Sequence, residues 1–192
     1  GLTTPLLPHG HRAFVIEFDF IGHRVVISTT DGDQTVTSLR PQSVASFYAE
    51  TMATLEAMRL PVRIWPVPVE IPNPIPFAQD TQHASYDAAY ANRFWRILVQ
   101  AHRLFSIARS TFIGKSSPVH FFWGSCDLAV TRFSGRPAPP RDGPAFMRDA
   151  YSHEVISHGF WPGSGPIHEP AFYAYAVPEP NGLKDAPVLP KG

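Results

Sequence analysis

The sequence predicts an α+β protein: a mostly antiparallel, mixed sheet of about six to eight strands with two helices packed on one face. Three observations favour this class. Short runs of alternating apolar and polar residues, bounded by turn residues, occur near both ends of the chain. Two longer segments instead repeat apolar residues at helical spacing. The 192 residues are 44% hydrophobic and 17% charged, which suits a single domain, 1–192, with a substantial core.

The first third of the chain is expected to form an antiparallel meander and then a helix. Residues 13–20, 24–29 and 34–39 read as strands separated by turn-forming residues. Pro41 suits the first position of a helix, and apolar residues then recur at helical spacing up to Leu60. We expect this helix to pack one face on the sheet.

Residues 62–76 are rich in proline, and every proline falls on an even position. Backbone donors alternate sides along an extended chain, so these prolines remove N–H groups from one edge only. The pattern predicts an edge strand protected against outside pairing. A proline-rich ligand for an aromatic groove is the alternative, but the embedded Ile, Trp and Val side chains favour packing within the fold.

A long helix is expected between an N-cap at Asp87 and a stop at Gly114. Its arginines could hold an anion, but a row of charges on a helix is more typical of a solvated face. Two strands are expected around 154–161 and 171–177, and residues 178–192 are expected to form a tail. Because the sequence begins without Met, we expect it to be an excised segment of a longer protein.

Between these elements, the residues around Gly124-Ser125 are expected to form a hairpin. A two-residue turn and a four-residue loop over 123–126 both give the same strand register. That register puts His120 and Asp127 on one face as diagonal neighbours, about 7–8 Å apart. Cys126 is expected on the opposite, apolar face, which should be core.

The His120–Asp127 pair has two interpretations. In the first, the carboxylate orients the imidazole and makes it more basic, so that His120 is a catalytic general base or a metal ligand. In the second, the pair is half-buried and stabilises the hairpin by a hydrogen bond. No cofactor is expected. If a divalent metal is bound, the expected ligands are His83, His120 and His153, although no short-range ligand motif supports such a site.

Three functions are consistent with the sequence. The favoured one is a small-molecule-binding domain with an aromatic pocket and polar His/Asp anchors. The alternatives are a metal-dependent or His/Asp-based, hydrolase-like enzyme, and a structural or protein-interaction domain. The residues expected to bind the small molecule are Trp65, His83, Phe122, Trp123, His153, Glu154, Trp161 and Tyr173.

Charge and cysteine content argue against several classes of partner. The 16 basic residues balance the 16 acidic ones, so nothing favours nucleic acid or an anionic membrane. A single cysteine excludes an internal disulfide and fits a reducing compartment. No run of residues resembles a membrane span or a signal peptide. We therefore expect a cytoplasmic protein; its oligomeric state is not indicated.

Several long strings of the sequence resemble a family known as domain of unknown function 5996. They include VRIWPVPVEIPNPIPF, QHASYDAAYANRFWRILVQ and IGKSSPVHFFWGSCDLAVTRFSGR, and the resemblance covers most of the chain. It implies that full-length relatives extend further at both ends. Relatives often carry Phe at the position of Cys126, which argues against a role for the thiol. The resemblance implies no particular activity and no catalytic residues.

Overall fold

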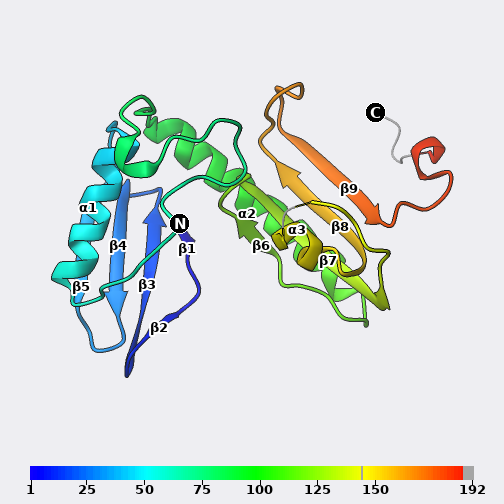
Figure 1. Ribbon diagram of the computed structural model, residues 1–192, viewed down its shortest axis with the longest axis horizontal. Coiled ribbons are helices and arrows are strands. Elements are labelled where there is room, and N and C mark those ends of the chain that lie inside the picture. The colour runs from blue at the N-terminus through cyan, green and yellow to red at the C-terminus, as the bar shows by residue number, and fades with distance from the viewer. Residues whose placement is uncertain (144, 188–192) are drawn as a thin grey trace. The chain divides into compact units, whose positions relative to one another are not determined.

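The computed structural model describes residues 1–143 and 145–187. The chain divides into two units, Gly1–Ile97 and Leu98–Gly192, which we describe separately (Figure 1). Within the described residues, three α-helices accompany two antiparallel sheets, so the α+β class and the antiparallel pairing are confirmed. The strands form one sheet in each unit, however, and not the single sheet that we expected.

The first unit contains a five-stranded sheet in which β3 pairs with β1, β2 and β4, and β4 pairs with β5. The strands are β1 (Leu2–Thr3), β2 (Leu7–His9), β3 (Arg12–Asp19), β4 (Arg24–Thr29) and β5 (Gln34–Ser38). The three longer ones match the expected meander, with small shifts at their ends. Their register places Phe14, Val25 and Ile27 on one face, where all three are buried.

Helix α1 (Val44–Ala57) packs on this face of the sheet. It begins after Ser43, whose hydroxyl oxygen accepts a hydrogen bond from the N–H of Ser46 at 3.1 Å, and not at Pro41 as expected. Leu55 of the helix and Phe14 of β3 are both 4% exposed. Burying an apolar side chain of this size contributes about 1.5–3 kcal/mol to folding, so this contact is a main source of the unit's stability.

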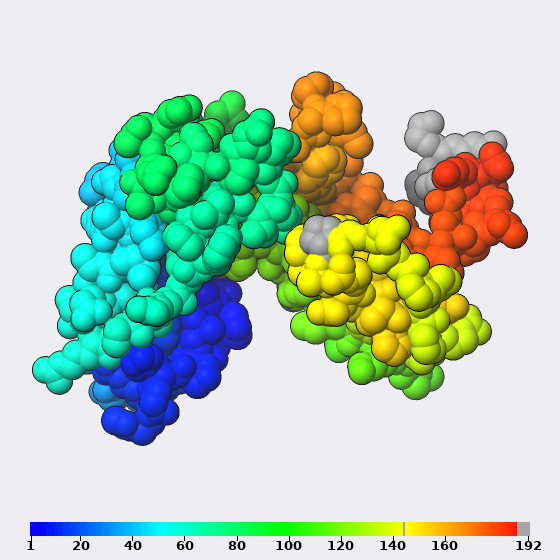
Figure 2. All heavy atoms as spheres, viewed as in Figure 1, coloured from blue at the N-terminus to red at the C-terminus, as the bar shows by residue number. Residues whose placement is uncertain are grey.

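The segment between the first two α-helices forms no strand, so the edge strand expected at 62–76 is wrong. The segment is described throughout, and its only regular element is a short 3-10 helix, η1 (Phe77–Gln79). Its prolines leave too few N–H donors for a β-ladder. The N–H of Phe77 donates to the carbonyl of Pro66 at 2.9 Å and turns the segment back on itself. Figure 2 shows it, in turquoise to green, spread over the surface of the first unit.

Helix α2 (Ala88–Ser110) begins in the first unit and ends in the second. Its start confirms the expected cap, because the N–H of Tyr90 donates to Asp87 Oδ1 at 2.9 Å. In the second unit, the ring of Phe105 meets that of Phe172 edge-on, with centroids 6.0 Å apart. Leu98, Ala101 and Phe105 are the buried residues of the helix, and through Phe105 this part of α2 packs against the second sheet.

The second sheet has the strand order β6-β7-β8-β9. Its strands are β6 (His120–Phe122), β7 (Asp127–Pro137), β8 (His153–Trp161) and β9 (Ala171–Val177). Two short elements were not expected, α3 (Ala145–Ala150) and a 3-10 helix, η2 (Leu183–Asp185). Of the expected tail, residues 188–192 lie outside the described residues.

The turn between β6 and β7 has four residues, Trp123–Cys126, one of the two lengths that preserve the expected register. Phe122 then pairs with Asp127, and His120 pairs two positions further along β7. His120 and Asp127 therefore share a face, as expected. The core position expected for Cys126 is wrong: this residue is exposed, because a left-handed backbone (φ 57°) at the end of the turn directs it outward.

Candidate functional site

Asp127, at the start of β7, is a buried carboxylate with two hydrogen-bond donors. The hydroxyl of Ser125 donates to Oδ1 at 2.5 Å, and the phenol of Tyr173 donates a short hydrogen bond to Oδ2. These two donors offset the cost of burying the charge. Ser125 belongs to the hairpin turn and Tyr173 to β9, so the carboxylate ties both to β7.

The reach of Tyr173 depends on a glycine. Ala129 of β7 pairs with Gly159 of β8, and Gly159 pairs with Tyr173 of β9, so all three lie in one row of the sheet. A Cβ atom on Gly159 would overlap the ring of Tyr173. Because Gly159 has no side chain, the phenol crosses β8 and meets Asp127. Burial, and then the hydrogen bond to the carboxylate, raise the pKa of Tyr173, which stays protonated as a donor.

His120 lies on the same face but is not bonded to Asp127. Its ring packs against Phe122, with centroids 4.4 Å apart, and no hydrogen bond links it to Asp127 among the described residues. Burial lowers the pKa of His120 more than the nearby negative charge of Asp127 raises it. The imidazole is therefore neutral at neutral pH, and the partners of the carboxylate are Ser125 and Tyr173.

Two further tyrosines extend this polar cluster. The ring of Tyr175 stacks on that of Tyr173, with centroids 6.0 Å apart, and its hydroxyl lies 3.1 Å from that of Tyr151. Burial, followed by the hydrogen bond to Tyr175, raises the pKa of Tyr151 to about 12. The guanidinium of Arg141 lies over the Tyr151 ring, 4.6 Å from its centroid. Sequence reasoning placed Tyr173 near a site but missed Tyr151, which lies in the turn before β8 while its partner Tyr175 lies in β9.

The other residues expected in the second unit are dispersed. His153 begins β8, whereas Gly159 is the residue of β8 that lies in the same row of the sheet as His120. The six residues between them correspond to about 20 Å along the strand. Glu154 accepts hydrogen bonds from Arg136 Nε at 2.7 Å and from Ser134 Oγ at 2.8 Å. These bonds lower the pKa of Glu154.

Three expected aromatic residues lie closer to the hairpin. Trp161, at the end of β8, shares the face of Asp127 by register. Phe122 also shares that face and is 44% exposed, while Trp123 lies in the turn and is 46% exposed. The ring of Trp123 packs edge-on against that of Phe121, on the opposite face, with centroids 5.3 Å apart.

The remaining two expected residues, His83 and Trp65, belong to the first unit. His83 Nδ1 lies 2.8 Å from Asp80 Oδ2, and the N–H groups of Gln82 and His83 donate to the same carboxylate. The backbone N–H of His83 is the main cause that lowers the pKa of Asp80. The Asp80 carboxylate and His83 thus satisfy each other within one turn of the chain. Trp65 is 73% exposed. No three His, Cys, Asp or Glu side chains of the described chain gather closely enough to hold a metal ion.

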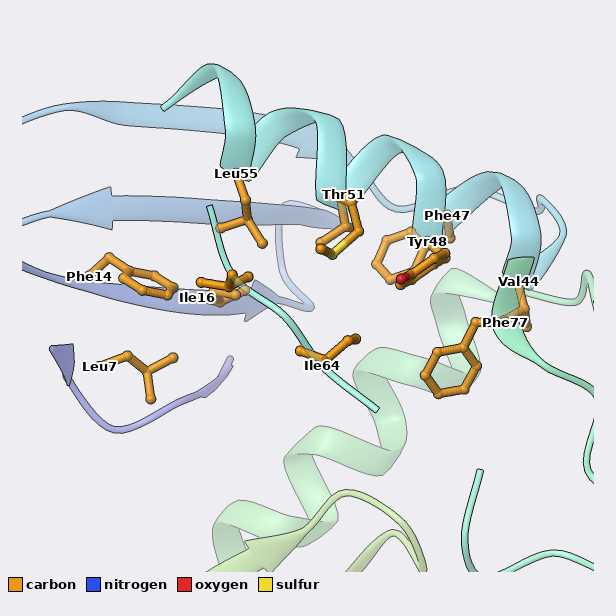
Figure 3. A pocket seen from close by; sticks show the side chains of 12 residues that line it. Leu7, Phe14, Ile16, Val44, Phe47, Tyr48, Thr51, Leu55, Ile64 and Phe77 are labelled. Atoms are coloured by element: carbon orange, nitrogen blue, oxygen red, sulfur yellow. The ribbon is translucent and has the colours of Figure 1, made fainter. Parts of the chain in front are cut away.

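The first unit contains a hollow that we did not predict, a pocket of about 410 Å³ beside α1 (Figure 3). Side chains of β2 and β3 face those of α1 across it, and the segment after α1 closes one side. It is lined by Leu7, Phe14, Ile16, Val44, Phe47, Tyr48, Thr51, Met52, Leu55, Val62, Ile64 and Phe77. The helical spacing of Val44, Phe47 and Tyr48 marked the inner face of α1, but it did not show that part of this face lacks a covering strand.

The pocket is apolar and uncharged. None of its lining side chains carries a charge, and the hydroxyl groups of Tyr48 and Thr51 contribute almost nothing to its surface. The ring of Tyr48 lies against that of Phe77, with centroids 5.8 Å apart, which fixes one wall. Such a site has nothing to offset the desolvation of an ionised ligand, so it selects for neutral molecules.

Comparison with known proteins gives the family of the chain. The chain belongs to the Family of unknown function (DUF5996), whose model matches residues 1–192, so the resemblance expected from the sequence is confirmed. No curated protein matches the sequence, and no solved structure matches the fold. None of the helices in the described part of the chain combines the length and the apolar character needed to cross a bilayer.

Proposed function

We propose that the protein binds a small, neutral, largely apolar molecule in the pocket of the first unit. The observation that carries this proposal is a hollow of about 410 Å³ lined by apolar and aromatic side chains. Ligand sites in proteins occupy roughly 300–1,000 Å³ and are lined in the same way, with few polar groups. Phe14 and Leu55 are shared by the pocket and the buried core, so the inner wall is fixed by the packing of the sheet against α1.

The lining defines the chemistry of the ligand. Aromatic rings from Phe14, Phe47 and Phe77 suit a ring or a short aliphatic chain. The hydroxyls of Tyr48 and Thr51 contribute almost nothing to the surface of the pocket. A carboxylate or an amine would have no charged partner among these residues, so we propose an uncharged, apolar ligand.

This proposal retains small-molecule binding but not the anchors expected from the sequence. His120 and Asp127 do not line this pocket. The hydrogen bonds of Asp127 to Ser125 and Tyr173 favour a stabilising role for that carboxylate in the second unit. The small-molecule site that we propose is therefore apolar, and the polar cluster is separate from it.

Titration with 1-aminoanthracene, a neutral fluorescent molecule, tests the proposal. The intact protein should give a saturable rise in fluorescence with a blue shift. Thr51→Trp places an indole in the pocket. The indole takes up space that the dye would occupy, so the dye buries less apolar area and its binding should weaken by about tenfold or more. Ala53→Trp adds the same ring on the exposed side of α1 and should leave binding unchanged.

A second variant tests the proposal even if Thr51→Trp fails to fold. Ile64 is 50% exposed and lies in the segment without a strand, so Ile64→Glu adds a charge to the wall without disturbing the sheet. It should also weaken binding of the dye. Absence of saturable binding to the intact protein, or equal binding by the Ile64→Glu and Ala53→Trp variants, would overturn the proposal.

A further inference from the structure

The second unit contains a separate pocket, of about 490 Å³, at the end of its sheet remote from the hairpin turn. Its walls come from the chain after α2, from β7, β8 and β9, and from the residues that follow β9. It is lined by Phe112, Arg132, Phe133, Ser134, Arg136, Glu154, Val155, Ile156, Ala176, Val177, Pro178, Glu179 and Pro180. Unlike the pocket of the first unit, this one contains charged side chains.

Three of the four charged residues in this pocket are neutralised by partners. Arg136 and Glu154 pair with each other at 2.7 Å. Glu179 lies 3.7 Å from the ammonium group of Lys184. Arg132 is the exception, because it forms no ion pair with any residue that the structure describes. The pocket therefore presents one uncompensated positive charge.

Arg132 is also held in a fixed orientation. Its Nη2 donates to the carbonyl of Ala108, in the last turn of α2, at 2.7 Å. One face of the guanidinium lies over the ring of Phe112, 5.0 Å from the ring centroid. Stacking occupies the face of the guanidinium and leaves its in-plane N–H groups for other partners. A guanidinium fixed in this way loses little entropy when it binds an anion.

We infer that this second pocket binds an amphipathic monocarboxylate, with its carboxylate on Arg132 and its apolar part against Phe112, Ile156 and Pro178. An arginine fork matches a carboxylate with two parallel hydrogen bonds. The neighbouring carboxylates of Glu154 and Glu179 are already paired, so they repel a single negative charge only weakly. This site is independent of the proposed function in charge, ligand class and residues.

Binding of octanoate, with 1-octanol as the uncharged counterpart, tests the inference by calorimetry. The intact protein should bind octanoate about tenfold or more tightly than 1-octanol. The two molecules have the same tail, and only octanoate adds a charge-assisted hydrogen-bonded pair with Arg132. Arg132→Gln should lower the affinity for octanoate by about tenfold while leaving that for 1-octanol unchanged. Arg103→Gln is the matched control, because this arginine is exposed on α2 and does not line the pocket, and it should change neither affinity.

Two further variants keep the result interpretable. Ile156 is 50% exposed, so Ile156→Trp fills the pocket while keeping the charge of Arg132, and it should abolish octanoate binding even if Arg132→Gln fails to fold. Thr51→Trp should not affect octanoate binding, which separates this site from the pocket of the first unit. Equal binding of octanoate and 1-octanol, or equal effects of Arg132→Gln and Arg103→Gln, would overturn the inference.

Discussion

The phenol of Tyr173 donates a hydrogen bond to the carboxylate of Asp127, so that β9 is tied to the first residue of β7 across the intervening strand β8. The pair joins residues 46 positions apart in the sequence. Ser125 supplies the other donor to the same carboxylate from within the hairpin turn. The turn and the edge strand are therefore held by one buried charge.

Removing the phenol should destabilise the protein. Tyr173→Phe keeps the ring but leaves the buried carboxylate of Asp127 with one donor fewer, which we expect to lower the free energy of unfolding by about 1–3 kcal/mol. Urea denaturation followed by circular dichroism measures this change. Tyr90→Phe, on a side chain 65% exposed, is the control and should change it little. Equal stability of the two variants would show that the hydrogen bond contributes nothing.

The lack of a side chain at Gly159 should contribute as much to stability as the phenol of Tyr173, because the ring of Tyr173 occupies the space beside Gly159. Gly159→Ala places a methyl group where the ring of Tyr173 lies, so the ring must move and the bond to Asp127 must break. We expect a loss of about 1–3 kcal/mol, typical of overpacking. The same substitution in a Tyr173→Ala background should cost much less. A double-mutant cycle measures this coupling, and simple additivity would contradict the explanation.

Stability should fall as the pH is lowered from neutral to about 5. The pKa values of His120 and His158 are both lowered from 6.5, mainly by burial. The unfolded chain therefore binds protons first in this window, and acid favours unfolding. Carboxylates with lowered pKa values, such as Asp19 at about 2, lose their contribution only at more acidic pH.

Two variants and a spectroscopic titration check this assignment. His120→Gln and His158→Gln should each make the stability less dependent on pH between neutral pH and about 5. In an NMR titration of the intact protein, the pKa values of both imidazoles should lie below 6.5, the ordinary value for histidine. A titration of His120 above that value would mean that Asp127 dominates its environment after all.

In the first unit, Arg12 should contribute more to the free energy of unfolding than an exposed arginine does. Its Nη2 donates to the carbonyls of Met58 at 2.6 Å and Arg59 at 2.8 Å, just after α1, and its side chain is 13% exposed. Arg12→Gln should lower the free energy of unfolding by about 1.5–3 kcal/mol, since charge-assisted hydrogen bonds are lost. Arg40→Gln, which removes an exposed pair with Glu50, should cost at most about 1 kcal/mol. Chemical denaturation compares the two.

Features set by local sequence could be predicted. The bounds of β4 and β9, and the cap at Asp87, follow from alternation and from the residue preferences of helix ends. The hairpin register follows from the parity of the turn, because two-residue and four-residue loops leave His120 and Asp127 on one face. These features depend on residues close together in the chain.

Features set by distant residues could not be predicted. Asp127 was paired with His120 in the sequence analysis, but Tyr173 reaches it only because β8 and β9 align Gly159 between them. The apolar pocket has a similar origin. Val62 and Ile64, in the segment that forms no strand, line it together with residues of β2, β3 and α1, which alternation alone could not reveal.

That segment, which forms no strand, also places a chromophore one residue from the wall of the pocket in the first unit. Ile64 lines the pocket, and the next residue, Trp65, is 73% exposed. We expect a molecule that binds against Ile64 to change the polarity around the indole and shift its emission. The difference between the spectra of the intact protein and a Trp65→Phe variant isolates that signal, so occupancy can be followed without a label.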